Sequence, residues 1–332
     1  MAPVNTAPGR AGLVSTIVPV HDRARLLEEA VASALAQTWR PIEVLIVDDG
    51  STDDTPRVAD QMAAEHSEVR AIHVPNGGPG RAREAGRREA RGEFLQYLDS
   101  DDLLLPGKFA AQVAALRADT TAGVAYGWTA YRAGEAPAPR VEGAERPWKR
   151  TGERIERMFP SFLQSRWWGT STPLYRRSVT DAAGPWSELW NEEDWEYDCR
   201  IAALGVRLAY VPAFVSVQRD HAGTRLSRAA SSDPAKLRNR AIAHRRILEH
   251  AHRAGIGREA PEMRHFGRAV FLLSRQCGAA GLVEESRELA GLARRAAGGG
   301  RRAADVWLYA RLAELVGWRA LARVVSRLDR VR

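Results

Sequence analysis

Two acidic clusters each follow a short apolar run in the first third of the chain. Residues 42–47 (IEVLIV) lead into the sequence DDGS at Asp48, and residues 93–98 (EFLQYL) lead into DSDD at Asp99. Carboxylates at the ends of buried strands cost free energy unless they bind a cation or a polar ligand. Ligands of open α/β sheets lie beyond the carboxyl ends of the strands, so the two clusters predict one site for a polar ligand and a hard divalent cation.

The segments around these clusters alternate between strand-like and helix-like patterns. The candidate strands are Val14–Val18, Ile42–Val47, Val69–Val74, Glu93–Leu98 and Gly123–Trp128. The candidate helices between them are Leu26–Ala36, Asp54–Glu65, Arg81–Arg91 and Lys108–Arg117. Strands that alternate with helices form βαβ units, so we predict an α/β fold with a mainly parallel sheet.

The turn after the first candidate strand excludes two common nucleotide-binding motifs. It reads PVHDR from Pro19 to Arg23, without the glycine cluster of the dinucleotide fingerprint. The sequence also has no Walker A lysine loop. A nucleotide bound at this edge of the sheet would therefore be held in another way.

Several motifs, in order, resemble those of a known enzyme family. They are STIVPVHDR from Ser15, ALAQTW from Ala34, VDDGSTD from Val47, NGGPGRAR from Asn76 and DSDD from Asp99. Together they resemble the nucleotide-sugar-binding half of the family 2 glycosyltransferases, over about residues 13–225. The resemblance implies the GT-A fold, which is a Rossmann-like mixed, mainly parallel sheet flanked by helices. It also implies metal-assisted, inverting transfer of a sugar from a nucleoside diphosphate to a hydroxyl group.

The resemblance implies a pocket for the nucleotide base at the first cluster. Pro19, Val20 and His21 would form its wall, and Asp49 would accept a hydrogen bond from the base. The family often has an aromatic residue and an asparagine where this chain has His21 and Asp22. Uracil is the expected base, with guanine and thymine as alternatives.

The second cluster would hold the diphosphate and its cation. The resemblance makes Asp101 a direct ligand of Mn²⁺ or Mg²⁺ and places Asp99 and Ser100 on the donor side, with Asp99 as a further metal ligand. Hard oxygen ligands suit these cations. Arg81 or Arg83 would contact the diphosphate. For two other acids of these clusters the alternative is structural: Asp48 would close a turn and Asp102 would cap the next helix.

A third acidic run, NEEDWE from Asn191, is similar to the family's Glu-Asp motif on the acceptor side. An inverting transfer needs a base that takes the proton of the acceptor hydroxyl. We assign this role to Asp194, with Glu193 as the second choice. His221 falls where some relatives place a histidine ligand of the metal, and imidazole suits Mn²⁺.

The second half of the chain contains a tryptophan-rich region and then a helical one. The tryptophans of the first are Trp148, Trp167, Trp168, Trp186, Trp190 and Trp195. We expect most of them to pack in a core, and stacking on sugars is the alternative. From about Asp233 the chain reads as helices, ending with one over about Ala303–Val331 that mixes apolar residues with arginines. We expect this helix to pack on the catalytic domain, and contact with an anionic membrane is the alternative.

Composition bounds the remaining possibilities. The formal net charge of +8 favours an anionic partner, although a general use of arginine explains it equally well. Cys199 and Cys277 are the only cysteines, so no disulfide framework is expected. The sequence has no secretion signal at its N-terminus and no apolar stretch long enough to span a bilayer. We therefore expect a cytoplasmic protein, with peripheral attachment to the inner face of a membrane as an option.

The predicted domains follow these patterns. A disordered lead covers residues 1–12, a GT-A domain covers 13–230, and a helical C-terminal region covers 231–332. Within the GT-A domain, 13–130 is the donor half and 150–230 is the acceptor half. The acceptor class is open between a glycan, a lipid-linked glycan, a protein and a small metabolite.

Three other functions are less consistent with the sequence. A sugar-1-phosphate nucleotidyltransferase should have a Gly-rich loop where Pro19 to Arg23 stands. A non-catalytic module that binds sugar nucleotides or anionic polymers would not need both Asp99-x-Asp101 and Glu193-Asp194. A nucleic-acid partner is not expected, because the basic residues are spread over helices without a recognised binding motif.

Overall fold

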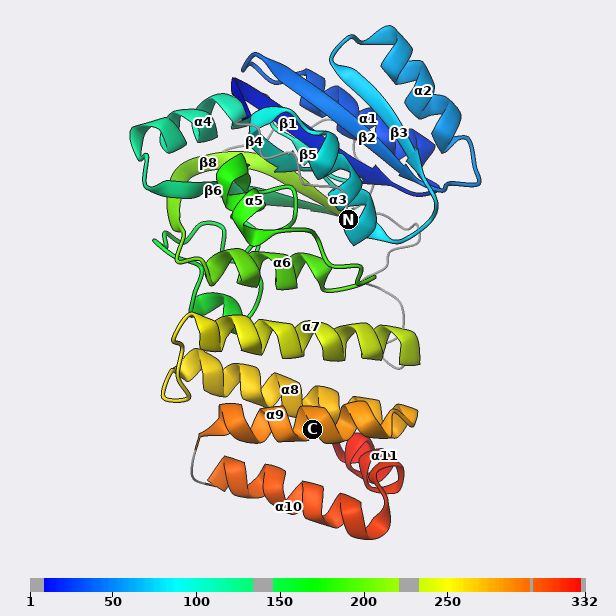
Figure 1. Ribbon diagram of the computed structural model, residues 1–332, viewed down its shortest axis with the longest axis vertical. Helices are drawn as coiled ribbons and strands as arrows, with labels where there is room; N and C mark the ends of the chain where they lie inside the picture. The colour runs from blue at the N-terminus through cyan, green and yellow to red at the C-terminus, as the bar shows by residue number, and fades with distance from the viewer. Residues whose placement is uncertain (1–8, 134–145, 221–232, 299–300, 330–332) are drawn as a thin grey trace. The chain divides into compact units, whose positions relative to one another are not determined.

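The computed structural model describes residues 9–133, 146–220, 233–298 and 301–329 (Figure 1). The chain divides into two compact units. The first consists of Met1–Arg157, Trp167–Glu188 and Leu204–Gly223. The second consists of Met158–Arg166, Leu189–Ala203 and Thr224–Arg332. The segments 158–166 and 189–203, which we placed in the acceptor half, thus cluster with the C-terminal helices.

The first unit is built on a mixed sheet with the strand order β3-β2-β1-β4-β7-β6-β8-β5. The strands are β1 (Arg10–Val20), β2 (Ile42–Asp49), β3 (Val69–Val74), β4 (Gly92–Tyr97), β5 (Leu103–Leu104), β6 (Ala122–Ala133), β7 (Leu174–Arg176) and β8 (Arg207–Asp220). Strands β3, β2, β1 and β4 are parallel neighbours, and so are β6 and β8. Strands β7 and β5 pair antiparallel with their neighbours. The predicted mixed, mainly parallel sheet is confirmed.

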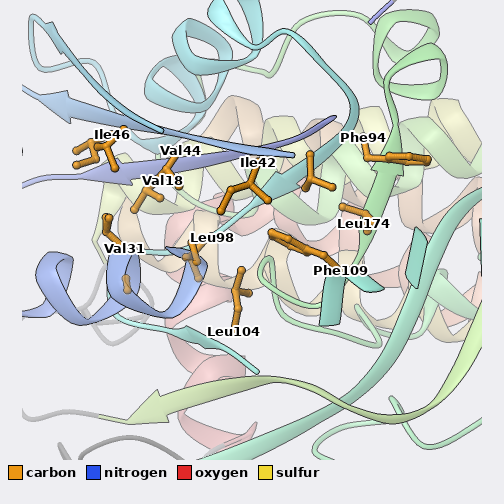
Figure 2. Close-up of a cluster of buried hydrophobic side chains, with 14 of the residues drawn as sticks. Val18, Val31, Ile42, Val44, Ile46, Phe94, Leu98, Leu104, Phe109 and Leu174 are labelled. Atoms are coloured by element: carbon orange, nitrogen blue, oxygen red, sulfur yellow. The ribbon is translucent and has the colours of Figure 1, made fainter. Parts of the chain in front are cut away.

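Helices cover both faces of this sheet. They are α1 (Ala24–Leu35), α2 (Thr55–Glu65), α3 (Pro79–Glu89), α4 (Lys108–Ala118) and α5 (Arg177–Ala183). Side chains of α1, α2 and α4 share one buried cluster with β1, β2 and β4, part of which is shown in Figure 2. Helix α3 lies on the opposite face, where a Cβ at Gly86 would come within 2.4 Å of Ile17 and 3.0 Å of Val47. Because both faces are covered, the central strands are nearly continuous apolar runs, which is why the sequence identified them.

The first unit differs from the sequence prediction at its short or terminal elements. Strand β1 begins at Arg10, inside the segment 1–12 that we expected to be disordered. We did not predict β5 and β7, because strands of two or three residues are too short to show a periodic pattern. Strand β7 nevertheless joins β4 to β6 and so completes the sheet.

The second unit is helical. It contains the 3₁₀ helix η1 (Ser161–Leu163) and the helices α6 (Glu193–Ala202), α7 (Pro234–Arg253), α8 (Pro261–Ala280), α9 (Val283–Ala297), α10 (Arg301–Val316) and α11 (Trp318–Asp329). Helix α11 packs on α8, and α10 packs on α9 and α11. Among the described helices, none has the length and apolar character needed to cross a bilayer.

The prediction of a single last helix over about Ala303–Val331 is wrong. The chain breaks at Gly317, between α10 and α11, where φ is +92°. Only glycine adopts this left-handed region without steric cost, so it commonly ends a helix. One isolated glycine in a long helical pattern was not read as a break, which explains the error.

Candidate active site

Three carboxylates meet in the turn that follows β4. Asp99, Asp101 and Asp102 each offer an oxygen atom, and these atoms lie within 4.8 Å of one another. The backbone N–H of Asp102 donates to the carbonyl of Asp99 over 2.9 Å, which folds the turn back on itself. Carboxylate oxygens this close together suit Mg²⁺ or Mn²⁺, so these residues fit the cation that the sequence predicts.

Asp102 is the buried member of this cluster, at 1% exposure. Its carboxylate accepts a hydrogen bond from Ser171 Oγ at 2.9 Å and one from the backbone N–H of Arg219 at 3.3 Å. Burial, and then the charges of Asp101 and Asp99, raise the pKa of Asp102 well above its ordinary value. The alternative that Asp102 caps the next helix is wrong, because α4 begins only at Lys108.

Arginine side chains surround the cluster. Arg23 Nη1 lies 3.0 Å from Asp101 Oδ2, and Arg83 Nη2 lies 2.8 Å from Asp99 Oδ1. The buried Arg219 donates from Nε to the carbonyl of Asp101 at 2.6 Å. Neither Arg23 nor Arg219 was expected here, because each is far from the cluster in sequence.

The first acidic cluster lies at the carboxyl end of β2, beside the end of β1. Pro19 and Val20 pair in register with Val47 and Asp48, and both are buried. His21 is exposed, and its Nδ1 lies 3.0 Å from the carbonyl oxygen of Asp49. The structure therefore brings the four predicted base-pocket residues together.

The carboxylate of Asp49 holds the loop that leads into α3. Its two oxygens accept hydrogen bonds from the backbone N–H groups of Gly77 and Gly78, each at 2.8 Å. Burial raises the pKa of Asp49, while these two amides, His21 and Arg81 act in the opposite direction. A carboxylate oxygen has two lone pairs, so hydrogen bonding to a base stays a prediction that this geometry allows.

Asp48 has the turn role that we gave as its alternative. One of its carboxylate oxygens accepts from the backbone N–H of Ser51 at 3.0 Å. The other lies 3.0 Å from His73 Nδ1 on β3. Both contacts are structural: one closes the turn after β2 and the other joins β2 to its neighbour β3.

The two candidate diphosphate ligands on α3 differ in environment. Arg83 is 4% exposed, and its guanidinium lies 4.9 Å from the centre of the Trp186 ring as well as against Asp99. Arg81 is exposed in the first turn of α3. Arg81 is therefore the one that is accessible to a diphosphate in solution. Ser100 is buried in the turn between the acidic residues.

Glu84, on α3 next to Arg83, has a structural role. Its carboxylate lies 2.8 Å from Arg87 Nε and 2.9 Å from Arg88 Nε, and it accepts from the backbone N–H of Trp186 at 3.2 Å. Burial acts to raise the pKa of Glu84, but these arginines outweigh it and hold the pKa below its ordinary value. Through the hydrogen bond from Trp186, Glu84 connects α3 to the segment 167–188 of the first unit.

The third acidic run opens α6 in the second unit. Glu193, Asp194 and Glu196 lie in the first helical turn, where acidic side chains interact favourably with the helix dipole. Asp194 Oδ2 lies 2.5 Å from Arg166 Nη1, and the same guanidinium contacts Asp198 through Nε at 2.7 Å. The Asp194 side chain is 29% exposed, whereas Glu193 is 6% exposed as a residue. A general base must reach its substrate, so this difference favours Asp194 over Glu193.

Two other acids of this run are structural. Glu196 lies 2.5 Å from Arg200 Nη2 and 2.8 Å from His250 Nε2. Burial acts to raise its pKa, but the hydrogen bonds from His250 and Arg200 outweigh it and lower the pKa of Glu196 to about 2. Glu192 lies 2.8 Å from Arg240 Nε on α7. These contacts fasten α6 to α7 within the second unit.

The predicted site residues are thus distributed over both units. The base-pocket residues, the acidic cluster and the α3 arginines belong to the first, and Glu193 and Asp194 belong to the second. His221 lies outside the described residues.

Comparison with known proteins gives a family match over half of the chain. Residues 15–180 match the model described as Glycosyl transferase family 2. Glycosyltransferase GlyG of Streptococcus pneumoniae is 38% identical over 93 residues, which is 28% of this chain and 31% of GlyG. Chondroitin synthase of Escherichia coli is 43% identical over 97 residues, which is 29% of this chain and 14% of that protein. The matched stretch therefore spans less than a third of the length of these relatives.

Solved structures are similar over nearly the whole chain. S. aureus TarS 1–349 in complex with UDP-GlcNAc has a TM-score of 0.64 at 18% identity, over 95% of this chain and 91% of the other. The mannosyltransferase PcManGT of Pyrobaculum calidifontis, in complex with GDP-Man and Mn²⁺, has a TM-score of 0.51 at 21% identity, over 98% and 90%. At these identities the likeness concerns the fold, and it confirms the predicted GT-A architecture with C-terminal helices.

Proposed function

Because the chain belongs to glycosyl transferase family 2, we propose that it transfers a sugar from a nucleoside diphosphate to a hydroxyl group, with inversion at the anomeric carbon. The observation that carries this proposal is the group of three carboxylates within 4.8 Å at the end of β4. It lies in the same unit as the base-pocket residues at the ends of β1 and β2. The product would have a β-linkage if the donor is α-linked.

The donor side of the proposal uses residues of the first unit. Pro19, Val20 and His21 would contact the base, and Asp49 would accept a hydrogen bond from it. TarS and PcManGT, which share the fold, are described with UDP-GlcNAc and GDP-Man respectively. These complexes support a nucleotide-sugar donor, and we expect uridine as the nucleoside.

A divalent cation fits the acidic cluster by the nature and spacing of its oxygen atoms. Asp99, Asp101 and Asp102 would hold it, and it would offset the negative charge that the leaving diphosphate gains. Of the α3 arginines, Arg81 is the exposed one and would contact the diphosphate from its other side. The Mn²⁺ named with PcManGT supports a cation in a protein of this fold.

The acceptor side of the proposal uses the second unit. The acceptor oxygen would form a bond to the anomeric carbon as the bond from that carbon to the diphosphate oxygen breaks and its electron pair leaves with the diphosphate. Asp194 would take the hydroxyl proton, and Arg166 at 2.5 Å would orient its carboxylate. Glu193 is the second candidate for this base. Direct displacement requires no covalent intermediate between sugar and enzyme.

The experiment that tests the proposal is a donor screen. UDP-, GDP- and dTDP-sugars would be assayed for binding and for slow hydrolysis, with and without Mn²⁺, on the wild type and on Asp101→Asn. We expect Mn²⁺-dependent binding of one nucleotide class, which Asp101→Asn removes.

Asp119→Asn is the matched control for this screen. Asp119 precedes β6, which runs parallel to β4, so it lies at the opposite edge of the sheet from the acidic cluster. The control should bind as the wild type does. If no donor binds with or without Mn²⁺, the transferase proposal fails and a non-catalytic binding module is the better interpretation.

A further inference from the structure

Helix α10 has two apolar faces. One is buried within the second unit and contains Val306, Tyr309 and Ala313, at 5%, 7% and 0% exposure. The other is exposed and contains Leu308, at 52% exposure. A helix that is apolar on both sides normally has a partner on each.

The second face of α10 is continuous along the helix. It contains Leu308, Leu312 and Leu315, at 52%, 40% and 82% exposure. These positions are spaced i, i+4 and i+7, so they lie on one side of the helix. Trp307, 47% exposed, and Val316, 58% exposed, flank them. We call Trp307, Leu308, Leu312, Leu315 and Val316 the α10 outer face.

Basic side chains lie within and next to this face. Arg311 lies between Leu308 and Leu315 on the same side of the helix, and its guanidinium is 5.6 Å from the centre of the Trp307 ring. On α11, the helix that follows α10, Arg319 and Arg323 are exposed.

Helix α10 has fewer acidic than basic residues, and one of the acidic ones forms an ion pair. Glu314 lies 3.1 Å from Arg287 Nε on α9. Asp305 is exposed at the margin of the outer face.

The charge of the chain is divided unequally between its two parts. Residues 233–332 contain 21 Lys and Arg against 10 Asp and Glu, which gives +11 in a chain whose total is +8. Residues 1–232 therefore have a net charge of −3. The exposed apolar face thus belongs to the strongly basic part of the protein.

We infer that the α10 outer face, with the arginines beside it, binds the surface of an anionic lipid membrane. An apolar strip between basic side chains is the pattern of a helix that lies in the plane of a membrane interface. The leucines would enter the acyl boundary, and Arg311, Arg319 and Arg323 would contact acidic headgroups. The charge also disfavours a second copy of this chain, because two regions of +11 would repel each other.

This inference goes beyond the proposed function and does not depend on it. The test measures lipid binding alone, so loss of transferase activity would neither support nor contradict it. The protein would be sedimented with vesicles of phosphatidylcholine alone and with vesicles that contain 30% phosphatidylglycerol, at low and high salt (composition chosen to give about the charge of an acidic leaflet). The variant is Leu308→Ser/Leu315→Ser.

We expect the wild type to partition at least about tenfold more strongly to the anionic vesicles, and this preference to weaken at high salt. The double variant should bind the anionic vesicles at least about tenfold more weakly. A tenfold change corresponds to about 1.4 kcal/mol, which is within what the burial of two leucine side chains contributes.

Leu204→Ser/Leu272→Ser is the matched control, because these leucines are also exposed, at 47% and 41%, but lie outside α10. The control should bind vesicles as the wild type does. The inference is overturned if the wild type does not sediment with anionic vesicles or if Leu308→Ser/Leu315→Ser sediments equally well. It is also overturned if sedimentation velocity shows an oligomer that this variant dissociates, because the face would then join copies of the chain.

Discussion

At the scale of single residues, the acidic cluster is defined as much by its arginines as by its carboxylates. Arg23 lies 3.0 Å from Asp101 and Arg83 lies 2.8 Å from Asp99. Each guanidinium offsets a charge that would otherwise be repelled by the neighbouring acids. A cation bound to the same oxygens would compete with both arginines, so these pairs should set the affinity for metal.

The first prediction concerns the pair between Arg23 and Asp101. Arg23→Met removes the competing charge but keeps an apolar side chain of similar length. The affinity for Mn²⁺ should increase about fivefold, since a partly exposed ion pair is worth about 1 kcal/mol. Titration of Mn²⁺ followed by electron paramagnetic resonance measures the free ion directly and requires no sugar donor.

Arg57→Met is the control for this titration, since Arg57 on α2 is 65% exposed and contacts Asp54 and Gln61, each at 3.5 Å, rather than the acidic cluster. It should bind Mn²⁺ like the wild type. An unchanged or weaker affinity of Arg23→Met would contradict the competition.

The sequence identified part of this cluster and missed the rest for a physical reason. Asp99 and Asp101 could be predicted because their type and spacing follow directly from one strand end. Asp102 was open to a capping role, since its partners Ser171 and Arg219 are 69 and 117 residues away in sequence. A pattern read along the chain contains no information on such distant partners.

At the scale of elements, the strands that carry the site were predictable because they are buried on both faces. Every residue of β2 is buried, including the carboxylates at its end. Strand β7 has only three residues, which pair with β4 on one side and β6 on the other. Three residues are too few to show the alternation of apolar and polar side chains that identifies a strand. The last helix was overextended because Gly317 breaks it through backbone conformation alone.

The second prediction tests that conformation. Gly317→Ala should lower the free energy of unfolding by about 1 kcal/mol, because an alanine at φ +92° is strained even though no atom lies within 4 Å of its Cβ. Thermal unfolding followed by circular dichroism measures this change as a lower Tm.

Gly107→Ala is the matched control, since its Cβ would also meet no atom within 4 Å, but its φ is −84°. This variant should lower the free energy of unfolding by less than Gly317→Ala does, because alanine adopts a φ of −84° without strain. Equal effects of the two variants would show that the left-handed conformation of Gly317 carries no cost.

The third prediction concerns the contact between α6 and α7. The pKa of Glu196 is lowered from 4.5 to about 2 by His250 and Arg200, so its stabilising effect is fully present above about pH 4.5 and is lost as the pH falls toward 2. The wild type should therefore lose up to about 3 kcal/mol from this group over that interval, at 1.36 kcal/mol per pKa unit.

Glu196→Gln measures this effect. The difference in urea midpoint between the wild type and Glu196→Gln should be largest above pH 5 and should shrink as the pH falls to 2. Glu249→Gln is the control on α7, because Glu249 is 58% exposed and lies 3.9 Å from Arg245. A difference that is independent of pH would contradict the ion-pair explanation.

At the scale of the whole molecule, the groups that carry the proposed chemistry lie in two different units. The acidic cluster and the base-pocket residues are in the first unit, and Asp194 is in the second. We had predicted from the sequence that both motifs lie in one domain over residues 13–230. The chain passes between the two units several times within this range, and no sequence pattern marks these crossings. A change in one unit should therefore affect one part of the reaction and spare the other.

The fourth prediction separates these parts. Asp101→Asn should abolish Mn²⁺-dependent binding of the nucleotide and, with it, all hydrolysis of the donor. Asp194→Asn should leave nucleotide and Mn²⁺ affinity within about twofold of the wild type but lower the rate of donor hydrolysis by about 10² or more, because water then lacks its general base. Calorimetric titration gives the affinities, and release of the nucleoside diphosphate gives the rates without knowledge of the natural acceptor.

Glu193→Gln distinguishes the two acids at the start of α6 under the same assays. Glu193 is buried at 6% exposure, so this variant should retain most of the hydrolysis rate if Asp194 is the base. A full rate in Asp194→Asn together with a loss in Glu193→Gln would transfer the role to Glu193. If both variants hydrolyse the donor like the wild type, neither acid acts as the base. The acidic residues in the first turn of α6 would then have only a structural role, through their ion pairs with Arg166, Arg200 and His250.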